Sequence, residues 1–344
     1  MSTNYTYKID ISIAKALGII LMVVGHSNCP TLLHDFIYMF HMPLFFLVAG
    51  YCFKEEYLNN PKRFILRRFY GLWIPFVSIA IIFLLLHNLF ISFNLIEGIP
   101  YTFLDIFNRA KSIIISLHKE EALIGGFWFI PQLLFSSLIS FTLLKFFNKK
   151  HALLFAITLS IIFKYLDILI PYTAISWITF FASAFFISGN ILSCNNNIAN
   201  WRFLPPFIVL IGSLLIPSGI FVDHVWKILP YFFIAISGCI FILNISKTIA
   251  LNNNWFIKLL LFIGSKTMWI LTLHLLAFKL VTLLIIYIKD DSILNLRITP
   301  IHPEYSNYGI WIIYSLFGVL IPIGIAYLKE NISHHNNISY QKKS

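Results

Sequence analysis

Long apolar stretches constrain this chain more than any other feature of its sequence. They begin near Ile11 and recur almost to Leu328, separated by short polar breaks. A helix of roughly 20 apolar residues crosses a bilayer core about 30 Å thick, and many of these stretches reach that length. Their unbroken apolar character disfavours a β-barrel, whose strands alternate apolar and polar residues. The sequence therefore predicts an all-α integral membrane protein.

Composition supports this class. Of the 344 residues, 59% are hydrophobic and only 11% are charged, whereas a typical soluble domain has about 25% charged residues. A soluble globular protein is therefore excluded. The net charge of +11 does not indicate a nucleic-acid partner, because basic residues in a membrane protein set its orientation and contact membrane lipids.

We expect about ten transmembrane helices, separated by polar residues, Pro, Gly or Asn. The stretch from Phe256 to Ile288 is too long for one helix, and Gly264-Ser265-Lys266 interrupts it. The expected spans are 11–28, 36–53, 72–93, 127–147, 152–170, 174–193, 203–221, 228–246, 267–288 and 309–328.

Basic residues predict the orientation of these spans. Placing the N-terminus in the cytoplasm puts the basic segments 62–68 and 145–150 on the same side, so the positive-inside rule favours cytoplasmic N- and C-termini. We expect one polytopic membrane domain over residues 1–330 and a short polar cytoplasmic tail over 331–344. The four cysteines show no C-x-x-C spacing, and we expect no metal site.

Lys15 and His26 are ionisable residues inside the first expected span. A charge at a helix centre costs on the order of 2.5–3.5 kcal/mol in a membrane, so each such residue requires a reason. Eleven steps of about 100° make about three turns, which places both side chains on one face, roughly 16 Å apart. One face of this helix therefore links the inner and outer halves of the bilayer.

His41 opens the second span and is expected at a depth similar to that of His26. Histidine accepts and returns a proton near neutral pH, as activation of a hydroxyl requires. A lone histidine at this depth more often makes a structural hydrogen bond. The pair together with Lys15 favours a shared functional pocket.

Four basic residues precede the third span, and they suit an anionic cofactor such as the phosphates of coenzyme A. Orientation of the chain and contact with lipid headgroups also explain such a cluster, and both explanations can hold at once. The cluster consists of Lys62, Arg63, Arg67 and Arg68.

Trp128 and His274 are weaker candidates. Trp128 lies in an aromatic segment at the outer end of a span, where aromatic belts are expected in any case. His274 lies within a span, where lining an interior and making a structural hydrogen bond are equally good explanations.

Several of these pieces together resemble the acyltransferase 3 family of membrane proteins, in particular its sugar O-acetylase branch, similar to fucose 4-O-acetylase. The resemblance covers about residues 8–328. It is carried by Asp10, by Lys15-x10-His26, by the run Phe40-His41-Met42-Pro43-Leu44-Phe45-Phe46 to Gly50-Tyr51, by Arg67-Arg68 to Pro75, by Phe127-Trp128-Phe129, and by Gly264-Ser265-Lys266-Thr267 to His274.

The resemblance implies a ten-helix membrane O-acetyltransferase in a bacterial inner membrane. Acetyl-CoA would be the cytoplasmic donor, and the acceptor would be a hydroxyl of an envelope or exported glycan, either free or lipid-linked. The family's usual arginine is replaced here by Lys15, which keeps the positive charge but not bidentate contacts. The roles implied are general base or acyl carrier for His26 with His41 as its partner, donor steering or charge neutralisation for Lys15, cofactor binding for Arg67, Arg68, Arg63 and Lys62, and substrate binding for Trp128, Asp10 and His274.

Two other functions fit part of the sequence. A polytopic transporter or flippase for a glycan or small solute fits the apolar bulk, and the Gly264-Ser265 interruption resembles the broken helices of transporters. No internal repeat supports it, however. A non-catalytic scaffold leaves Lys15, His26 and His41 without a reason.

Overall fold

The computed structural model describes residues 2–118, 121–169, 177–194, 204–216, 219–251, 254–306 and 309–341, which form helices and no strand. Within these ranges, seven helical segments are long and apolar enough to cross a membrane. They are Ile9–His26, Thr31–Tyr51, Pro61–Leu85, Ala122–Phe146, Val225–Ala250, Thr267–Lys289 and Trp311–Ile332. Three shorter apolar helices accompany them. These helices agree with the predicted all-α membrane class. The count of about ten spans remains a prediction.

The individual helices of the first half of the chain vary widely in length. They are α1 (Ser2–His26), α2 (Thr31–Tyr38), α3 (His41–Tyr51), α4 (Glu56–Asn59), α5 (Pro61–Arg68), the π-helical turn η1 (Phe69–Trp73), α6 (Ile74–Leu85), α7 (His87–Ser92), α8 (Phe103–Ser116), the 3-10 helix η2 (Ala122–Trp128), α9 (Phe129–Phe146) and α10 (Lys149–Leu169).

The second half of the chain forms further α-helices and short 3-10 helices. They are α11 (Trp177–Ser193), α12 (Leu204–Leu215), η3 (Val225–Lys227), α13 (Ile228–Ala250), α14 (Trp255–Ser265), α15 (Thr267–Lys289), η4 (Ile293–Arg297), η5 (Pro303–Tyr305) and α16 (Trp311–Gln341). Most of the expected polar tail, which begins at residue 331, continues α16 as a helix.

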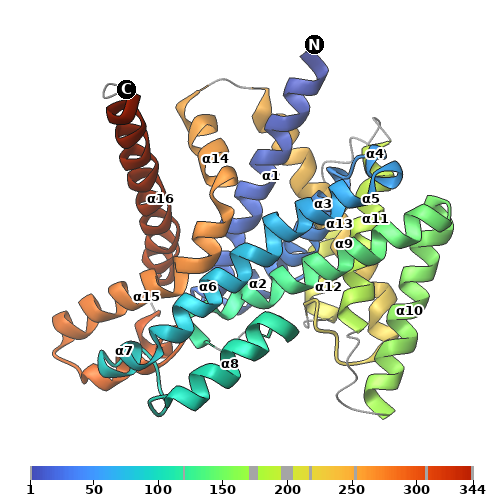
Figure 1. Cartoon of the computed structure of the whole chain (residues 1–344). Coiled ribbons are helices and arrows are strands. Elements are labelled where there is room, and N and C mark those ends of the chain that lie inside the picture. Colours follow the sequence, from blue (N-terminus) through green and yellow to red (C-terminus); the bar gives the residue numbers. More distant parts are fainter. Residues whose placement is uncertain are drawn as a thin grey trace.

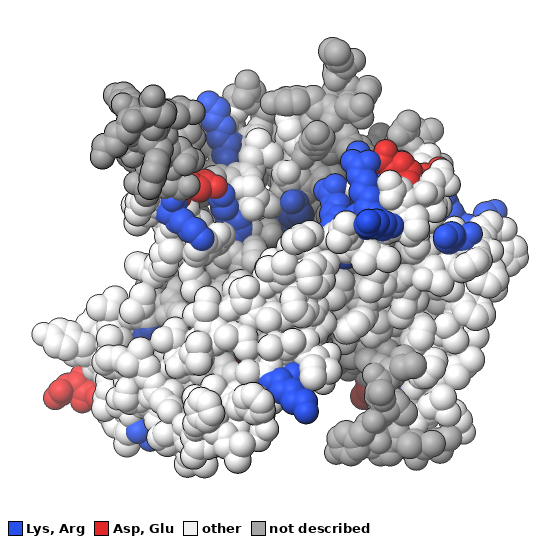
Figure 2. All heavy atoms as spheres, viewed as in Figure 1, with Lys and Arg blue, Asp and Glu red and all other residues white. Residues whose placement is uncertain are grey.

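The start of α1 and the end of α16 lie at the same end of the bundle (Figure 1). Figure 2 shows most of the visible Lys and Arg side chains gathered toward this end, which we call the basic end. The assignment of the basic end to the cytoplasm remains a prediction from charge.

The third expected span begins earlier than its apolar run indicates. Asn60 caps α5 by accepting a hydrogen bond from the backbone N–H of Arg63 at 3.2 Å, and Pro61 suits the first helical position. A helix therefore starts at residue 61 rather than at 72, and η1 joins it to α6 without a break. The basic cluster lies on this helix instead of preceding it. The apolar run misplaced the start because charged residues are tolerated where a helix leaves the hydrocarbon.

Two other breaks follow local chain geometry. The interruption expected at Gly264-Ser265-Lys266 is confirmed, since α14 ends at Ser265 and α15 begins at Thr267. The segment 29–35, which lies between the first two expected spans, is already helical from Thr31, where α2 begins.

Glycines let two helices meet backbone to backbone. A Cβ on Gly50 of α3 would overlap the carbonyl oxygen of Phe186 on α11, and a Cβ on Gly189 of α11 would overlap the carbonyl oxygen of Leu47. Small residues at membrane helix contacts allow such close approach, which maximises dispersion contacts where lipid supplies no hydrophobic drive. This contact holds α3, and with it His41, in place.

We expect Gly50→Ala to destabilise the fold by about 3 kcal/mol or more, because a methyl group cannot be accommodated against a carbonyl without separating two helices. Thermal unfolding in detergent measures the effect. Gly324→Ala on α16 is the control, since nothing lies within 4 Å of its Cβ position. Equal unfolding temperatures for both variants would contradict the close contact.

Candidate functional site: two cavities along α1

Two cavities lie along α1. The larger, about 380 Å³, is lined by Lys15, Arg67 and Arg68, and we call it the cationic cavity. The smaller, about 210 Å³, is lined by His26 and His41, and we call it the histidine cavity. The first falls within the range of about 300–1,000 Å³ typical of ligand pockets. One helix thus reaches both cavities through residues eleven positions apart.

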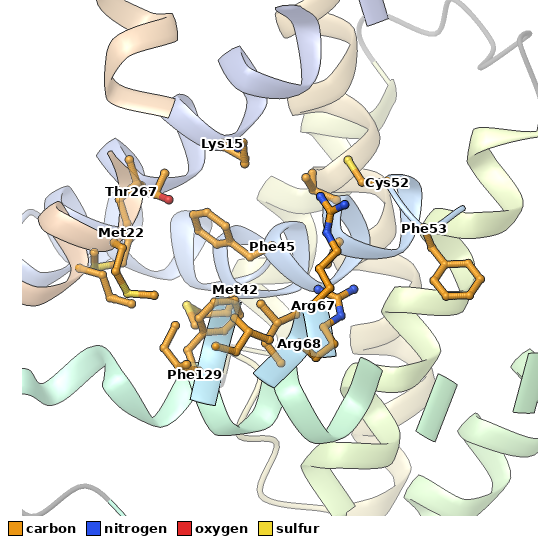
Figure 3. Close-up of a pocket in the computed structure, with 18 of the residues that line it drawn as sticks. Lys15, Met22, Met42, Phe45, Cys52, Phe53, Arg67, Arg68, Phe129 and Thr267 are labelled. Atoms are coloured by element: carbon orange, nitrogen blue, oxygen red, sulfur yellow. The ribbon is translucent and has the colours of Figure 1, made fainter. Parts of the chain in front are cut away.

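The cationic cavity combines positive charge with apolar walls. Figure 3 shows Lys15 extending from α1, Arg67 and Arg68 extending from α5, and Phe45 and Met42 farther along the cavity. Positive charge at one end and apolar side chains at the other suit a ligand that has an anionic head and an uncharged arm.

The two arginines are held differently. Arg67 donates from Nη1 to the hydroxyl oxygen of Tyr57 at 2.9 Å. The Arg68 guanidinium lies 5.1 Å from the ring centroid of Phe64 and 5.8 Å from that of Phe186, and its buried Nε has no hydrogen-bond partner among the residues that the structure describes. A buried donor without an acceptor is costly. Nε of Arg68 can therefore donate a hydrogen bond to an anionic ligand.

The other two basic residues of the cluster stay outside the cationic cavity. Lys62 and Arg63 are exposed and do not line it. Arg63 instead faces Glu56, with Nη1 3.6 Å from Oε1. Of the four residues predicted to bind the cofactor, the structure brings only Arg67 and Arg68 to the cavity with Lys15.

Cys52 also lines the cationic cavity. The residue is open to solvent on one side, while the surrounding protein partly desolvates its thiol. Burial raises the pKa of its thiol, and the charges of Lys15, Arg68 and Arg67 offset part of this rise. The three cations therefore act on one sulfur atom from two helices, α1 and α5. Cys52 had no assigned role in the sequence.

In the histidine cavity, each of the two lining histidines has one ring nitrogen engaged by a residue four positions earlier in the chain. Nδ1 of His26 lies 3.0 Å from Sδ of Met22, and Nδ1 of His41 lies 3.0 Å from the carbonyl oxygen of Ile37. A neutral ring that donates from Nδ1 keeps the Nε2 lone pair free to accept a proton. Each ring is thereby prepared to act as a base through Nε2.

His274 lies against His26 rather than on the cavity wall. Its ring stacks on the ring of His26 with a centroid distance of 5.2 Å and an interplanar angle of 25°. Nδ1 lies 3.0 Å from the carbonyl oxygen of Ile270, and the buried Nε2 has no hydrogen-bond partner. His274 thus supports the His26 ring and does not line the cavity.

Aromatic residues complete the histidine cavity. Trp128 lines it beside Phe221, with ring centroids 4.7 Å apart. Tyr38 also lines it, 4.8 Å from the ring of His41 and 6.4 Å from that of His26. Tyr38 was missed in the sequence, although its position three residues before His41 offered a signal.

Asp10 lies apart from the histidines. It is buried toward the basic end of α1, where Oδ1 accepts from the backbone N–H of Ile11 at 2.8 Å. It lines neither the cationic nor the histidine cavity. The structure thus separates Asp10 from Trp128 and His274, the residues with which it was grouped as substrate-binding. Among the described residues, no cluster of three His, Cys, Asp or Glu is arranged to hold a metal.

A sequence model of an acyltransferase domain matches residues 8–328, nearly the whole chain. The chain belongs to the acyltransferase 3 family. Searches of curated proteins and of solved structures find no match. Membership indicates a multi-pass membrane acyltransferase and does not favour a transporter. The lysine, arginines and histidines of the two cavities all lie within the matched region.

The cationic cavity predicts a pattern of cysteine reactivity in this acyltransferase. In detergent, N-ethylmaleimide should modify exposed Cys52 and Cys194 but spare buried Cys29 and Cys239. In a Cys194→Ser variant, the rate at which Cys52 is labelled should increase with pH. The increase should occur at a higher pH than for the free amino acid cysteine, because burial raises the pKa of the Cys52 thiol and only the thiolate reacts. Mass spectrometry of peptides measures both effects. Labelling of Cys239 before Cys52 would contradict the cavity.

Proposed function

We propose that this membrane acyltransferase moves an acetyl group from acetyl-CoA to a hydroxyl of an envelope glycan. The observation that carries the proposal is the course of α1, which passes from a cavity with three cations to a cavity with two histidines. A donor with an anionic head and a thioester at the far end of an uncharged arm matches this arrangement. Membership of the family supports acyl transfer as the reaction class.

The donor would enter from the basic end. Its phosphates would accept hydrogen bonds from Arg67 and from Nε of Arg68, which has no other partner. Lys15 would add positive charge without the forked geometry of a guanidinium. The apolar arm would lie against Phe45 and Met42, which line the same cavity.

In the transfer step, Nε2 of His26 would take the proton of the acceptor hydroxyl. The hydroxyl oxygen would form a bond to the thioester carbonyl carbon, and the C–S bond would break with the electron pair on sulfur. The protonated His26 would return the proton to the thiolate, giving coenzyme A and an acetyl ester. His41, on the same cavity, would hold the acceptor or share the proton.

A sugar acceptor fits the aromatic part of the histidine cavity. Trp128 and Phe221 provide flat aromatic surfaces beside polar imidazole groups, a combination that binds a ligand with both C–H faces and hydroxyl groups. We infer a glycan presented at the far side of a bacterial inner membrane, with the basic end in the cytoplasm. A lipid-linked form of this glycan would reach the cavity from the bilayer.

Arg68→Gln should raise the KM for acetyl-CoA about 10- to 100-fold, because a charge-assisted hydrogen bond to phosphate is lost. Acetyl transfer in inverted membrane vesicles from the source cells, supplied with radiolabelled acetyl-CoA, gives this constant. Arg63→Gln is the matched control, since Arg63 is exposed and lies outside the cationic cavity. An equal effect of both substitutions would assign the cluster to membrane orientation instead.

His26→Gln should lower ester-linked acetate on envelope glycans by about 100-fold or more, as expected for loss of a general base. Mild alkali releases this acetate from deletion cells that express either form of the protein at equal abundance. His151→Gln serves as the control, because His151 is exposed, bonds to the nearby Asn148 and lines neither cavity. Equal amounts of ester-linked acetate in deletion and wild-type cells would contradict acyl transfer and would favour transport of the glycan instead.

A further inference from the structure

We propose that Met22 and Met42 form the gate between the two cavities and thereby restrict the transferred acyl group to a short chain. This inference rests on the proposed function, and it names two specificity-determining residues. Met22, Met42 and Leu271 are the lining residues that the cationic and histidine cavities have in common. All three are almost fully buried. They therefore form the wall that separates the donor arm from the acceptor.

The two sides of this wall differ in rigidity. A Cβ on Gly126 would lie 2.8 Å from Cδ1 of Leu271, so the short, branched Leu271 side chain packs directly against the backbone of η2. Met22 and Met42 have unbranched side chains with three rotatable bonds, which adapt readily to the shape of a ligand. Opening of the wall would therefore occur on the methionine side.

Met22 also connects the gate to the catalytic base. Its Sδ lies 3.0 Å from Nδ1 of His26, so the side chain that closes the passage is the one that His26 contacts. Met42 comes from α3, one residue after His41. A thioester carbonyl that reaches Nε2 of His26 must pass between these two side chains, and the atoms beyond the carbonyl must fit the space that remains.

The chemistry of the wall selects the substrate class. It presents methyl, thioether and isobutyl groups to the acyl chain, with no charged group among its three residues. An uncharged two-carbon acyl group would meet little obstruction, whereas each added methylene would displace a wall side chain. Discrimination of about 10- to 200-fold per methylene is usual for a closed apolar pocket.

Removal of the gate tests the proposal. Met42→Ala and Met22→Ala each delete Cγ, Sδ and Cε from the wall, and each should raise the ratio of butyryl to acetyl transfer at least tenfold. Inverted vesicles from deletion cells that express each variant provide the native acceptor. Radiolabelled acetyl-CoA and butyryl-CoA are the probes, and alkali-labile label on the glycan is the readout.

Two matched variants separate gating from general loosening. Met268→Ala removes the same atoms from a residue that lines only the cationic cavity, and Met42→Leu keeps a large apolar side chain in the wall. Both should leave the ratio unchanged. Met42→Phe should lower transfer of both acyl groups, with butyryl transfer falling more.

The outcomes distinguish this inference from the proposed function. Acetyl transfer by the wild type with an unchanged ratio in Met42→Ala and Met22→Ala overturns the gate alone. An equal rise in the Met268→Ala variant also overturns it. Absence of acyl transfer from either donor by abundant wild-type protein overturns the proposed function, and the gate with it.

Discussion

The unbroken backbone hydrogen-bond ladder of α1 sets the geometry of both cavities. In hydrocarbon, each amide must be bonded within the helix, so the rise of about 1.5 Å per residue cannot be adjusted locally. Lys15 and His26 are therefore fixed roughly 16 Å apart on one face. Every other part of the site is brought to this rigid element: the arginines from α5, His41 from α3 and His274 from α15.

Buried rings in the bundle pair one nitrogen with a backbone carbonyl close by in the sequence. His41 and His274 each place Nδ1 against a backbone carbonyl one turn earlier. This arrangement satisfies one polar atom per ring in apolar surroundings. Among the residues that the structure describes, Nε2 of His274 and Nε of Arg68 remain buried without a hydrogen-bond partner. Under the proposed function, an anionic donor would supply the missing acceptor for Arg68.

Features that belong to one helix were predictable from the sequence. The shared face of Lys15 and His26 follows from periodicity, and the break before Thr267 follows from Gly264 and Ser265. Features that depend on two helices were not. The stacking of His274 on His26 joins segments far apart in the chain, and Arg63 differs from Arg67 by one turn along α5. Because of this offset of one turn, Arg67 lines the cationic cavity, whereas Arg63 lies near Glu56. The number of spans and the roles of the site residues remain predictions.

The π-helical turn η1 lies directly between the arginines and the buried part of α6. A π turn contains one more residue than an α turn, so it rotates the preceding segment by about 100° relative to a regular helix. Arg67 and Arg68 thus owe their facing direction to an inserted residue rather than to the phase of α6. Deletion of Gly71, which has open space beyond its Cα, would keep every cation in the sequence and turn this pair away from Lys15. Alignments of related chains should accordingly treat a one-residue gap at this turn as a change in charge placement.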